Sequence, residues 1–421
     1  MVPEVLRLRD FRRVFAAQVI SNVGDFFVPV AISFAVLDLT GSVSDLGLVL
    51  FARIIGQVLF FLAGGVWADR LPRLQVMIGS HALRFLTQGL LGLLLVSGVA
   101  RVWELVVLQF LHGAATAFFR PATTGLTPQL VPPDELQAAN GLMFASQSIG
   151  GIAGPIIGGS LVATVGAGWA LLGDAATFAI AAALLAQLPP LGSAPASTAS
   201  FWRELADGWT EVRSRTWLWT SIVDFAVFQM IYLATMMVLG PLVAKQSLGG
   251  AGAWALILTA FSVGTLLGNL LSLRLRPRRP LLVAWTIIFL CGPSLVLLAL
   301  KAPAWSIALT EVGAGLAIGV AGTLWETTLQ RHVPAEALSR VAAYDWMGST
   351  ALRPLGLVVV GPIASVFGVE ATLFGAFALT MVSSAVLLLI PDMWRVTDTG
   401  PAVQPSVLPA ETAGAEVEPV R

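Results

Sequence analysis

Eight ionisable side chains stand inside long apolar runs of this 421-residue chain, where a charge is costly and marks a candidate for function. They are Asp25, Arg53, Arg84, Asp174, Asp224, Glu311, Asp345 and Arg353. Burial favours the protonated form of a carboxyl group, whereas a cation beside it favours the carboxylate. A carboxyl group balanced between these influences can take up and release a proton. Two of the eight, Asp174 and Asp345, are expected to be structural charges near helix ends.

Asp25 is the strongest proton-binding candidate, because it stands about halfway along the first apolar run. At a helical rise of ~1.5 Å per residue, Asp25 lies ~18 Å deep and Arg53 lies ~21 Å deep in the second run. An unpaired arginine at that depth costs at least ~2.5 kcal/mol. We therefore expect Arg53 to pair with Asp25. Asp224 and Glu311 are the next candidates for carrying a proton.

The sequence carries no pattern typical of enzyme or metal chemistry. His81 and His112 are isolated, and no residues show metal-ligand spacing, a nucleophile elbow or a phosphate-binding loop. We therefore expect no metal, no cofactor and no enzymatic activity, and no pumping driven by ATP. The net charge of zero gives no reason to expect a nucleic-acid partner. The single cysteine, Cys291, excludes an internal disulfide.

Composition indicates that the solvent of this chain is a lipid bilayer. Hydrophobic residues make up 57% and charged residues 11%, and the mean hydropathy is +0.84, whereas about a quarter of a soluble domain is charged. A membrane helix needs about twenty apolar residues, and twelve such runs can be counted. The sequence therefore predicts an all-α membrane protein with twelve transmembrane helices.

Arginine placement predicts the orientation, because cytoplasmic loops are enriched in Lys and Arg. If the runs alternate, one side holds Arg7, Arg9, Arg12, Arg13, Arg70, Arg73, Arg203, Arg213, Arg215, Arg274, Arg276, Arg278, Arg279, Arg331 and Arg340. The loops of the other side hold only Arg101, Lys245 and Lys301. Both termini are therefore expected in the cytoplasm.

A break between the sixth and seventh runs divides the chain into two pseudo-repeats. The expected parts are a six-helix bundle (1–188), a cytoplasmic linker with a surface amphipathic helix (189–216), a second six-helix bundle (217–391) and a disordered cytoplasmic tail (392–421). Matching residues recur 202 positions apart, such as Gly113 with Gly315 and Gly166 with Gly368. Parallel repeats of this kind place a substrate site between the halves.

The fifth run contains Gly150-x-x-x-Gly154-Pro155-x-x-Gly158-Gly159. Glycines four apart lie on one helix face and let a second backbone approach closely. The proline removes a backbone hydrogen bond and bends the helix. The pattern resembles the antiporter motif in the fifth helix of major facilitator superfamily exporters, and this resemblance implies the fold of that superfamily and drug:proton antiport.

A second motif, Gly65-x-x-x-Asp69-Arg70-x-x-Arg73, follows the second run. It resembles the signature loop between helices two and three of the same superfamily. The resemblance implies that Asp69 latches the two halves in one state through a positive charge or a helix amino terminus. Pro72 stands where the family usually has a glycine, so the turn can differ here.

The segments from Phe119 to Pro132 and from Ala139 to Gly141 are similar to the macrolide-efflux and siderophore-exporter branch, and the resemblance extends over residues 4–392. In this superfamily an arginine often stands four residues before the glycine that matches Gly113, and it is often assigned to proton coupling. This chain has Gln109 there. Coupling must therefore rest on other residues.

The resemblance implies a secondary active exporter in the inner (cell) membrane of a bacterium, driven by proton antiport, with two halves that rock about a central cavity. Beside Asp25, candidate cavity residues are Asn22, Phe26, Phe118, Phe119, Gln147, Gln229 and Tyr232. Their aromatic and amide groups suggest an amphipathic substrate, a drug-like compound or a siderophore. The expected partners are this small molecule, protons and lipid, and the expected state is a monomer. Uptake by proton symport, and a non-transporting membrane sensor or assembly factor on the same fold, stay open as alternatives.

We predict that a cysteine placed at Ser247 is labelled from outside the cell and one placed at Ser193 from the cytoplasm, because the arginine asymmetry puts these loops on opposite sides. The measurement is labelling by a membrane-impermeant maleimide in intact cells and in inside-out vesicles, in a Cys291→Ala background. Labelling of both positions from one side, or the reverse pattern, would contradict the arrangement of six plus six spans.

Overall fold

The computed structural model describes residues 4–70, 72–132, 135–189, 209–272 and 274–398. Within these ranges the chain is helical and forms no strand. Twelve helical segments are long and apolar enough to cross a membrane. The predicted all-α architecture with twelve spans is therefore confirmed.

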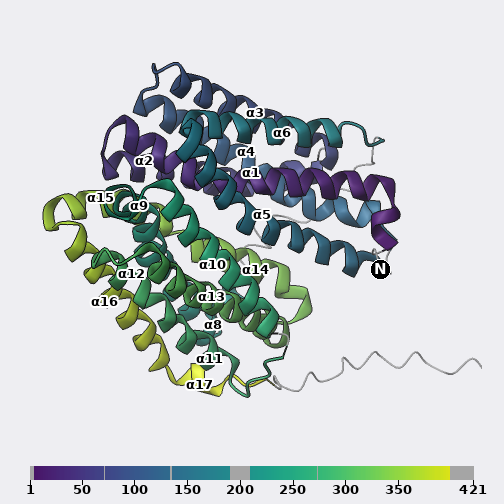
Figure 1. Cartoon of the computed structure of the whole chain (residues 1–421). Coiled ribbons are helices and arrows are strands. Elements are labelled where there is room, and N and C mark those ends of the chain that lie inside the picture. The colour runs from purple at the N-terminus through teal and green to yellow at the C-terminus, as the bar shows by residue number, and fades with distance from the viewer. Residues whose placement is uncertain (1–3, 71, 133–134, 190–208, 273, 399–421) are drawn as a thin grey trace, which may run out of the picture.

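The first half of the chain forms one helical bundle, coloured purple to teal in Figure 1. After the short helix η1 (Glu4–Arg7), its members are α1 (Arg9–Leu39), α2 (Val43–Arg70), α3 (Arg73–Val96), α4 (Val102–Leu130), α5 (Leu136–Val165) and α6 (Ala167–Leu185). We call this group the N-bundle.

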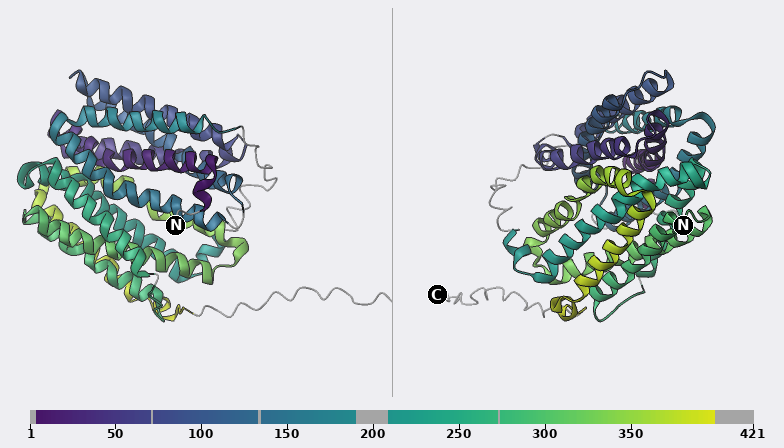
Figure 2. Two further views of the ribbon diagram at one scale, coloured as in Figure 1. Left: turned by 45° about the vertical axis from the view of Figure 1, so that its right-hand side comes forward. Right: turned by 90° about the vertical axis from the view of Figure 1, so that its left-hand side faces the viewer.

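The second half forms the C-bundle, green to yellow in Figure 1. Its seventh span is built from α8 (Thr216–Phe228), the π-helical turn η3 (Gln229–Leu233), α9 (Ala234–Val243) and the π-helical turn η4 (Ala244–Leu248). Then follow α10 (Ala251–Ser272), α11 (Pro280–Ile287), η5 (Ile288–Cys291), α12 (Gly292–Ala299), α13 (Ala304–His332), α14 (Ala335–Thr350), α15 (Arg353–Phe367) and α16 (Val369–Leu388). The two bundles lie one above the other in Figures 1 and 2.

The chain continues past the last span in a short folded segment. Helix α17 (Pro391–Arg395) buries Met393 completely, and the amide of Asp398 donates a hydrogen bond to the carbonyl of Arg278 (3.1 Å). Residues 392–398 are thus packed against the C-bundle, where a disordered tail was expected. The expected amphipathic segment at 201–208 and the tail from 399 lie outside the described residues.

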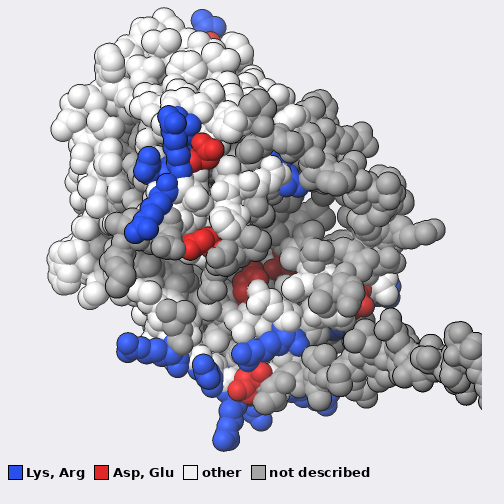
Figure 3. Space-filling view, turned by 90° about the vertical axis from the view of Figure 1, so that its right-hand side faces the viewer, with Lys and Arg blue, Asp and Glu red and all other residues white. Residues whose placement is uncertain are grey.

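Basic side chains gather at one end of both bundles, which we call the basic face. It lies on the right of Figure 1 and carries the start of α1 and the loop between α10 and α11. Figure 3 looks onto this face and shows Lys and Arg over both bundles, with acidic side chains in a recess between them. This asymmetry is the one that the sequence predicted, and the other end of the molecule is called the far face below.

Backbone contacts and an ion pair join the two bundles toward the far face, and the stacked rings of Phe61 and Trp346 join them on the other side of the cavity residues of α2. A methyl group added at Gly361 of α15 would lie 2.7 Å from Ser44 Cα at the start of α2, and one added at Gly47 would lie 3.2 Å from the carbonyl carbon of Leu357. Lys245 Nζ of η4 lies 2.6 Å from Asp38 Oδ1 at the end of α1. The bundles are thus joined by close backbone packing and an ion pair at this end.

The glycines of the fifth-run motif have two separate partners. Methyl groups added at Gly150, Gly154 and Gly158 would lie about 2.6–3.0 Å from atoms of the α1 segment between Asn22 and Phe27. One added at Gly159 would lie 3.2 Å from the carbonyl oxygen of Ala251 in α10, across the bundle boundary. The predicted close approach is present, and it occurs on both sides of α5.

The internal repeat is visible in the backbone. Gly166 and Gly368 both adopt positive φ (93° and 87°) between consecutive spans, a conformation that L side chains rarely adopt. Gly113 packs against the α2 backbone at Arg53, and its counterpart Gly315 packs against the α10 backbone at Phe261. The pairs that the 202-residue offset links therefore have the same structural role.

We predict that Gly154→Leu stops transport while the protein still inserts, and lowers the free energy of unfolding by about 1–3 kcal/mol or more. A methyl group there would already lie 2.6 Å from Phe26 Cβ and 2.9 Å from the carbonyl of Val23. The matched control is Gly141→Leu on the same helix, because nothing lies within 4 Å of a methyl group added there. Thermal unfolding in detergent and transport in vesicles are measured. Wild-type behaviour of Gly154→Leu would contradict a role for this contact.

Candidate functional site

Two adjoining lobes form a cavity between the bundles. The N-lobe, about 500 Å³, is lined mainly by α1 to α5 and includes Asn22, Asp25, Phe26, Phe119 and Gln147. The C-lobe, about 490 Å³, is lined mainly by C-bundle helices and includes Gln229. Ile54, Gln57 and Arg353 line both lobes. The cavity thus brings together five of the seven predicted substrate-cavity residues.

Asp25 is the acidic centre of the N-lobe. Its side chain is 24% exposed, and Arg53 Nη2 lies 3.5 Å from its Oδ1. The predicted Asp25–Arg53 contact is therefore present. The Arg84 guanidinium forms a second ion pair with the carboxylate and donates a hydrogen bond to Asp25 Oδ2, from a side chain that is only 1% exposed. One carboxylate thus forms ion pairs with two guanidinium groups.

Arg84 is a second cationic partner of Asp25, which the sequence analysis did not predict. It stands eleven residues after Arg73, where α3 begins, which is about 16 Å deep at ~1.5 Å per residue. That depth is close to the depth of Asp25, so the helical rise per residue also predicts Arg84 as a possible partner of Asp25. Its guanidinium carbon lies 4.0 Å from the centroid of the Phe178 ring, and this cation–π contact compensates in part for its burial.

A chain of side-chain amides leads from α4 to a second acid. Gln109 Nε2 donates to Gln88 Oε1 (3.0 Å), and Gln88 Nε2 donates to Asp174 Oδ2 (2.8 Å). Asp174 is fully buried and stands seven residues after the start of α6, which is deeper than the expected helix end, and it does not line either cavity lobe. The glutamine that replaces the expected arginine is a neutral member of this hydrogen-bonded chain.

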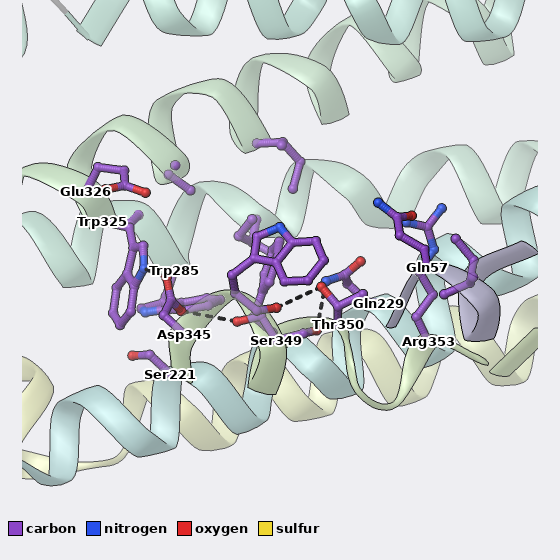
Figure 4. Close-up of a pocket in the computed structure, with 18 residues that line it drawn as sticks. Gln57, Ser221, Gln229, Trp285, Trp325, Glu326, Asp345, Ser349, Thr350 and Arg353 are labelled. Atoms are coloured by element: carbon purple, nitrogen blue, oxygen red, sulfur yellow. Dashed lines mark hydrogen bonds between the residues drawn. The ribbon is translucent and has the colours of Figure 1, made fainter. Parts of the chain in front are cut away.

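The C-lobe has a different chemistry, shown in Figure 4. Trp325 Nε1 donates to Asp345 Oδ2 (2.9 Å), and Ser349 Oγ donates to Asp345 Oδ1 (3.2 Å). Asp345 therefore lines the cavity, and it stands near the start of the eleventh span (Tyr344–Phe367), the end at which it was expected. Gln229 reaches this lobe from the π-helical turn and donates to the carbonyl of Ser349 (2.7 Å). A π turn shifts side-chain directions along a helix and is frequent at functional sites.

Four predicted residues do not line either lobe. The Phe118 ring packs against Phe60 with centroids 6.2 Å apart. Tyr232 is buried in the C-bundle, where its hydroxyl donates to Glu311 Oε1 (2.9 Å). Asp224 accepts a hydrogen bond from Ser383. These residues lie in predicted spans. Which face of each helix meets the cavity depends on packing that the sequence does not show.

The loop motif is only partly described. Gly65, Asp69 and Arg70 fall in the last turns of α2, where the side chains lie outside the described residues, so the predicted latch stays a prediction. Arg73 begins α3. No group of His, Cys, Asp and Glu in the described ranges could hold a metal ion.

Comparisons with known proteins concern the family of this chain. The family model described as Major Facilitator Superfamily matches residues 14–357. Macrolide efflux protein A of Streptococcus pyogenes is 25% identical over 86% of this chain and 90% of its own length. Enterobactin exporter EntS of Escherichia coli O1:K1 / APEC is 27% identical over 94% of this chain and 95% of its own.

A solved structure supports the fold. A bacterial homologue of the human lysosomal transporter Spinster, described as inward-facing and unoccupied, superposes with a TM-score of 0.70 at 14% identity, over 92% of this chain and 98% of that one. This likeness concerns the fold alone.

The fold and the central charged cavity are those of a membrane transporter. The family match covers most of the chain, and the chain belongs to the Major Facilitator Superfamily. It is therefore a multi-pass membrane transporter whose relatives include proteins named for efflux.

We predict that Asp25→Asn lowers the free energy of unfolding by about 3 kcal/mol, because it leaves the buried Arg84 without an acidic partner. The double variant Asp25→Asn/Arg84→Gln should recover part of this loss. The control is Asp10→Asn, which breaks the more exposed Arg13–Asp10 pair (3.4 Å) and should cost at most about 1 kcal/mol. Thermal unfolding in detergent is the measurement. Equal effects of the two single variants would show that Asp25 is not the compensating charge.

Proposed function

We propose that this protein exports an amphipathic small organic molecule from a bacterial cell in exchange for protons, as a monomer with both termini in the cytoplasm. The observation that carries the proposal is Asp25, a carboxylate open to the cavity and held between Arg53 and Arg84. A carboxyl group in this position can be ionised while both guanidinium groups contact it, and can be protonated when a contact loosens.

The shared wall of the two lobes gives a route for coupling. Gln57 and Arg353 line both lobes, and Arg53 lines the N-lobe beside Asp25. A substrate bound in the cavity is thus close to the groups that hold Asp25 ionised. Competition for these guanidinium groups would link substrate binding to proton binding, and this reciprocity is what antiport requires.

The conformation fits the loading step of an exporter. Close backbone contacts and the Lys245–Asp38 pair join the bundles toward the far face, and the C-lobe contains Glu326, six residues before the end of α13 at the basic face. With the basic face in the cytoplasm, the cavity would receive its substrate from inside the cell. Rocking of the bundles would then release it outside.

The names of relatives support export over uptake. Macrolide efflux protein A and enterobactin exporter EntS are both named for efflux, and α5 carries the glycine pattern that packs on α1 next to Asp25. A macrolide and a siderophore, with enterobactin as the first example, are therefore the first compounds to test. Proton symport and a non-transporting role have no comparable support.

We predict that inside-out vesicles with an acidic lumen accumulate the exported compound, and that a protonophore abolishes the accumulation. Asp25→Asn should abolish uptake driven by the pH gradient, because the residue can no longer exchange a proton, while compound binding is retained. The control is Asp10→Asn, which alters a more exposed carboxyl group that does not line the described cavity lobes.

The assay follows a radiolabelled macrolide and a labelled siderophore in vesicles with matched protein content. Normal gradient-driven transport by Asp25→Asn would place coupling elsewhere, with Asp224 and Glu311 as the next candidates. Accumulation under the opposite gradient would indicate symport, and no gradient-dependent movement of either compound would contradict the proposal.

A further inference from the structure

The C-lobe has opposite charges at its two ends. Asp345 and Glu326 lie at the end toward the basic face, and Arg353 lies at the deep end beside Gln57 (Figure 4). Asp345 lies in α14 and Arg353 is the first residue of α15, so the two charges come from consecutive helices. The wall between these ends is uncharged and contains Trp346, whose ring stacks on Phe61.

The charges at both ends lack ionic partners among the described residues. Arg353 forms no ion pair and no side-chain hydrogen bond there, and its buried Nε has no acceptor. Glu326 is exposed to the cavity and has no basic partner, and Asp345 accepts hydrogen bonds only from uncharged groups. This contrasts with Asp25 in the N-lobe, which is fully compensated by arginines. Unpaired charges inside a membrane protein are costly unless they serve a ligand or pathway.

A further polar group lies on the same wall without a partner. Trp285 is only 6% exposed, and its Nε1 donates no hydrogen bond in the described structure. Trp325 lies at the same end as Asp345. Indole faces attract organic cations, so this end combines aromatic rings with carboxylates, whereas the deep end offers a planar guanidinium fork suited to a carboxylate or phosphate.

We propose that the C-lobe recognises an amphipathic zwitterion, with Arg353 binding its anionic group and Asp345 and Glu326 binding its cationic amine at the opposite end of the lobe. The uncharged wall with Trp346 takes the apolar frame of the ligand. The biological meaning of this site rests on the proposed export function, but binding itself can be measured without transport.

The test uses three compounds with one aromatic frame: norfloxacin, which is a zwitterion, its ethyl ester, which is only a cation, and N-acetylnorfloxacin, which is only an anion. Binding to the purified full-length protein is measured by isothermal titration calorimetry. Norfloxacin should bind about tenfold or more tightly than either derivative, because each charge-assisted contact contributes about 1.5 kcal/mol or more.

Variants test which charged end of the C-lobe binds which charge of the ligand. Arg353→Gln should weaken norfloxacin about tenfold, to the level of the ester, while leaving the affinity for the ester unchanged. Glu326→Gln/Asp345→Asn should bring norfloxacin to the level of the N-acetyl compound. Unchanged binding of one derivative in each variant shows that the protein is folded.

The inference is overturned if the wild type binds the three compounds equally, or binds none at millimolar concentration, or if Arg353→Gln weakens all three alike. If the protein shows this binding pattern but no gradient-driven transport, the proposed function is contradicted and the zwitterion site is still supported.

Discussion

A charge in an apolar bundle needs compensation, and this constraint determines the interior of the N-bundle. Asp25 is the one acid that contacts both Arg53 and Arg84 in the described structure. The helices that carry these residues must therefore converge at one depth, and Gly113 permits this by letting α4 pack on the α2 backbone at Arg53. The central cavity forms where this converged cluster meets the C-bundle.

Helix α5 connects the charged cluster to the bundle boundary. Its face with Gly150, Gly154 and Gly158 lies on the α1 segment that contains Asp25, whereas Gly159 lies against α10. Close backbone packing resists small deformations, because protein interiors are as dense as organic crystals. A displacement of α10 relative to the N-bundle would therefore reach α1 through α5, and this mechanical link is independent of the charges in the cavity.

The sequence predicts the spans, their number, the repeat and the Asp25–Arg53 pair, because periodicity, arginine asymmetry and depth are local properties. It does not predict which helix face meets the cavity. Tyr232 and Gln229 are three residues apart, yet a π-helical turn sends one to Glu311 and the other to the C-lobe. Asp345 lines the C-lobe for the same kind of reason, because the rotation of its helix depends on neighbouring helices.

The ion pair between Lys245 and Asp38 has a different consequence. Its side chains are 35% and 58% exposed, so it stabilises the closed far face by at most about 1 kcal/mol. A contribution of this size changes the ratio of two conformations by roughly fivefold, and salt screens it over a Debye length of about 8 Å at physiological ionic strength. The resting balance between the two orientations of the cavity would therefore depend on the salinity of the medium that bathes this end of the protein.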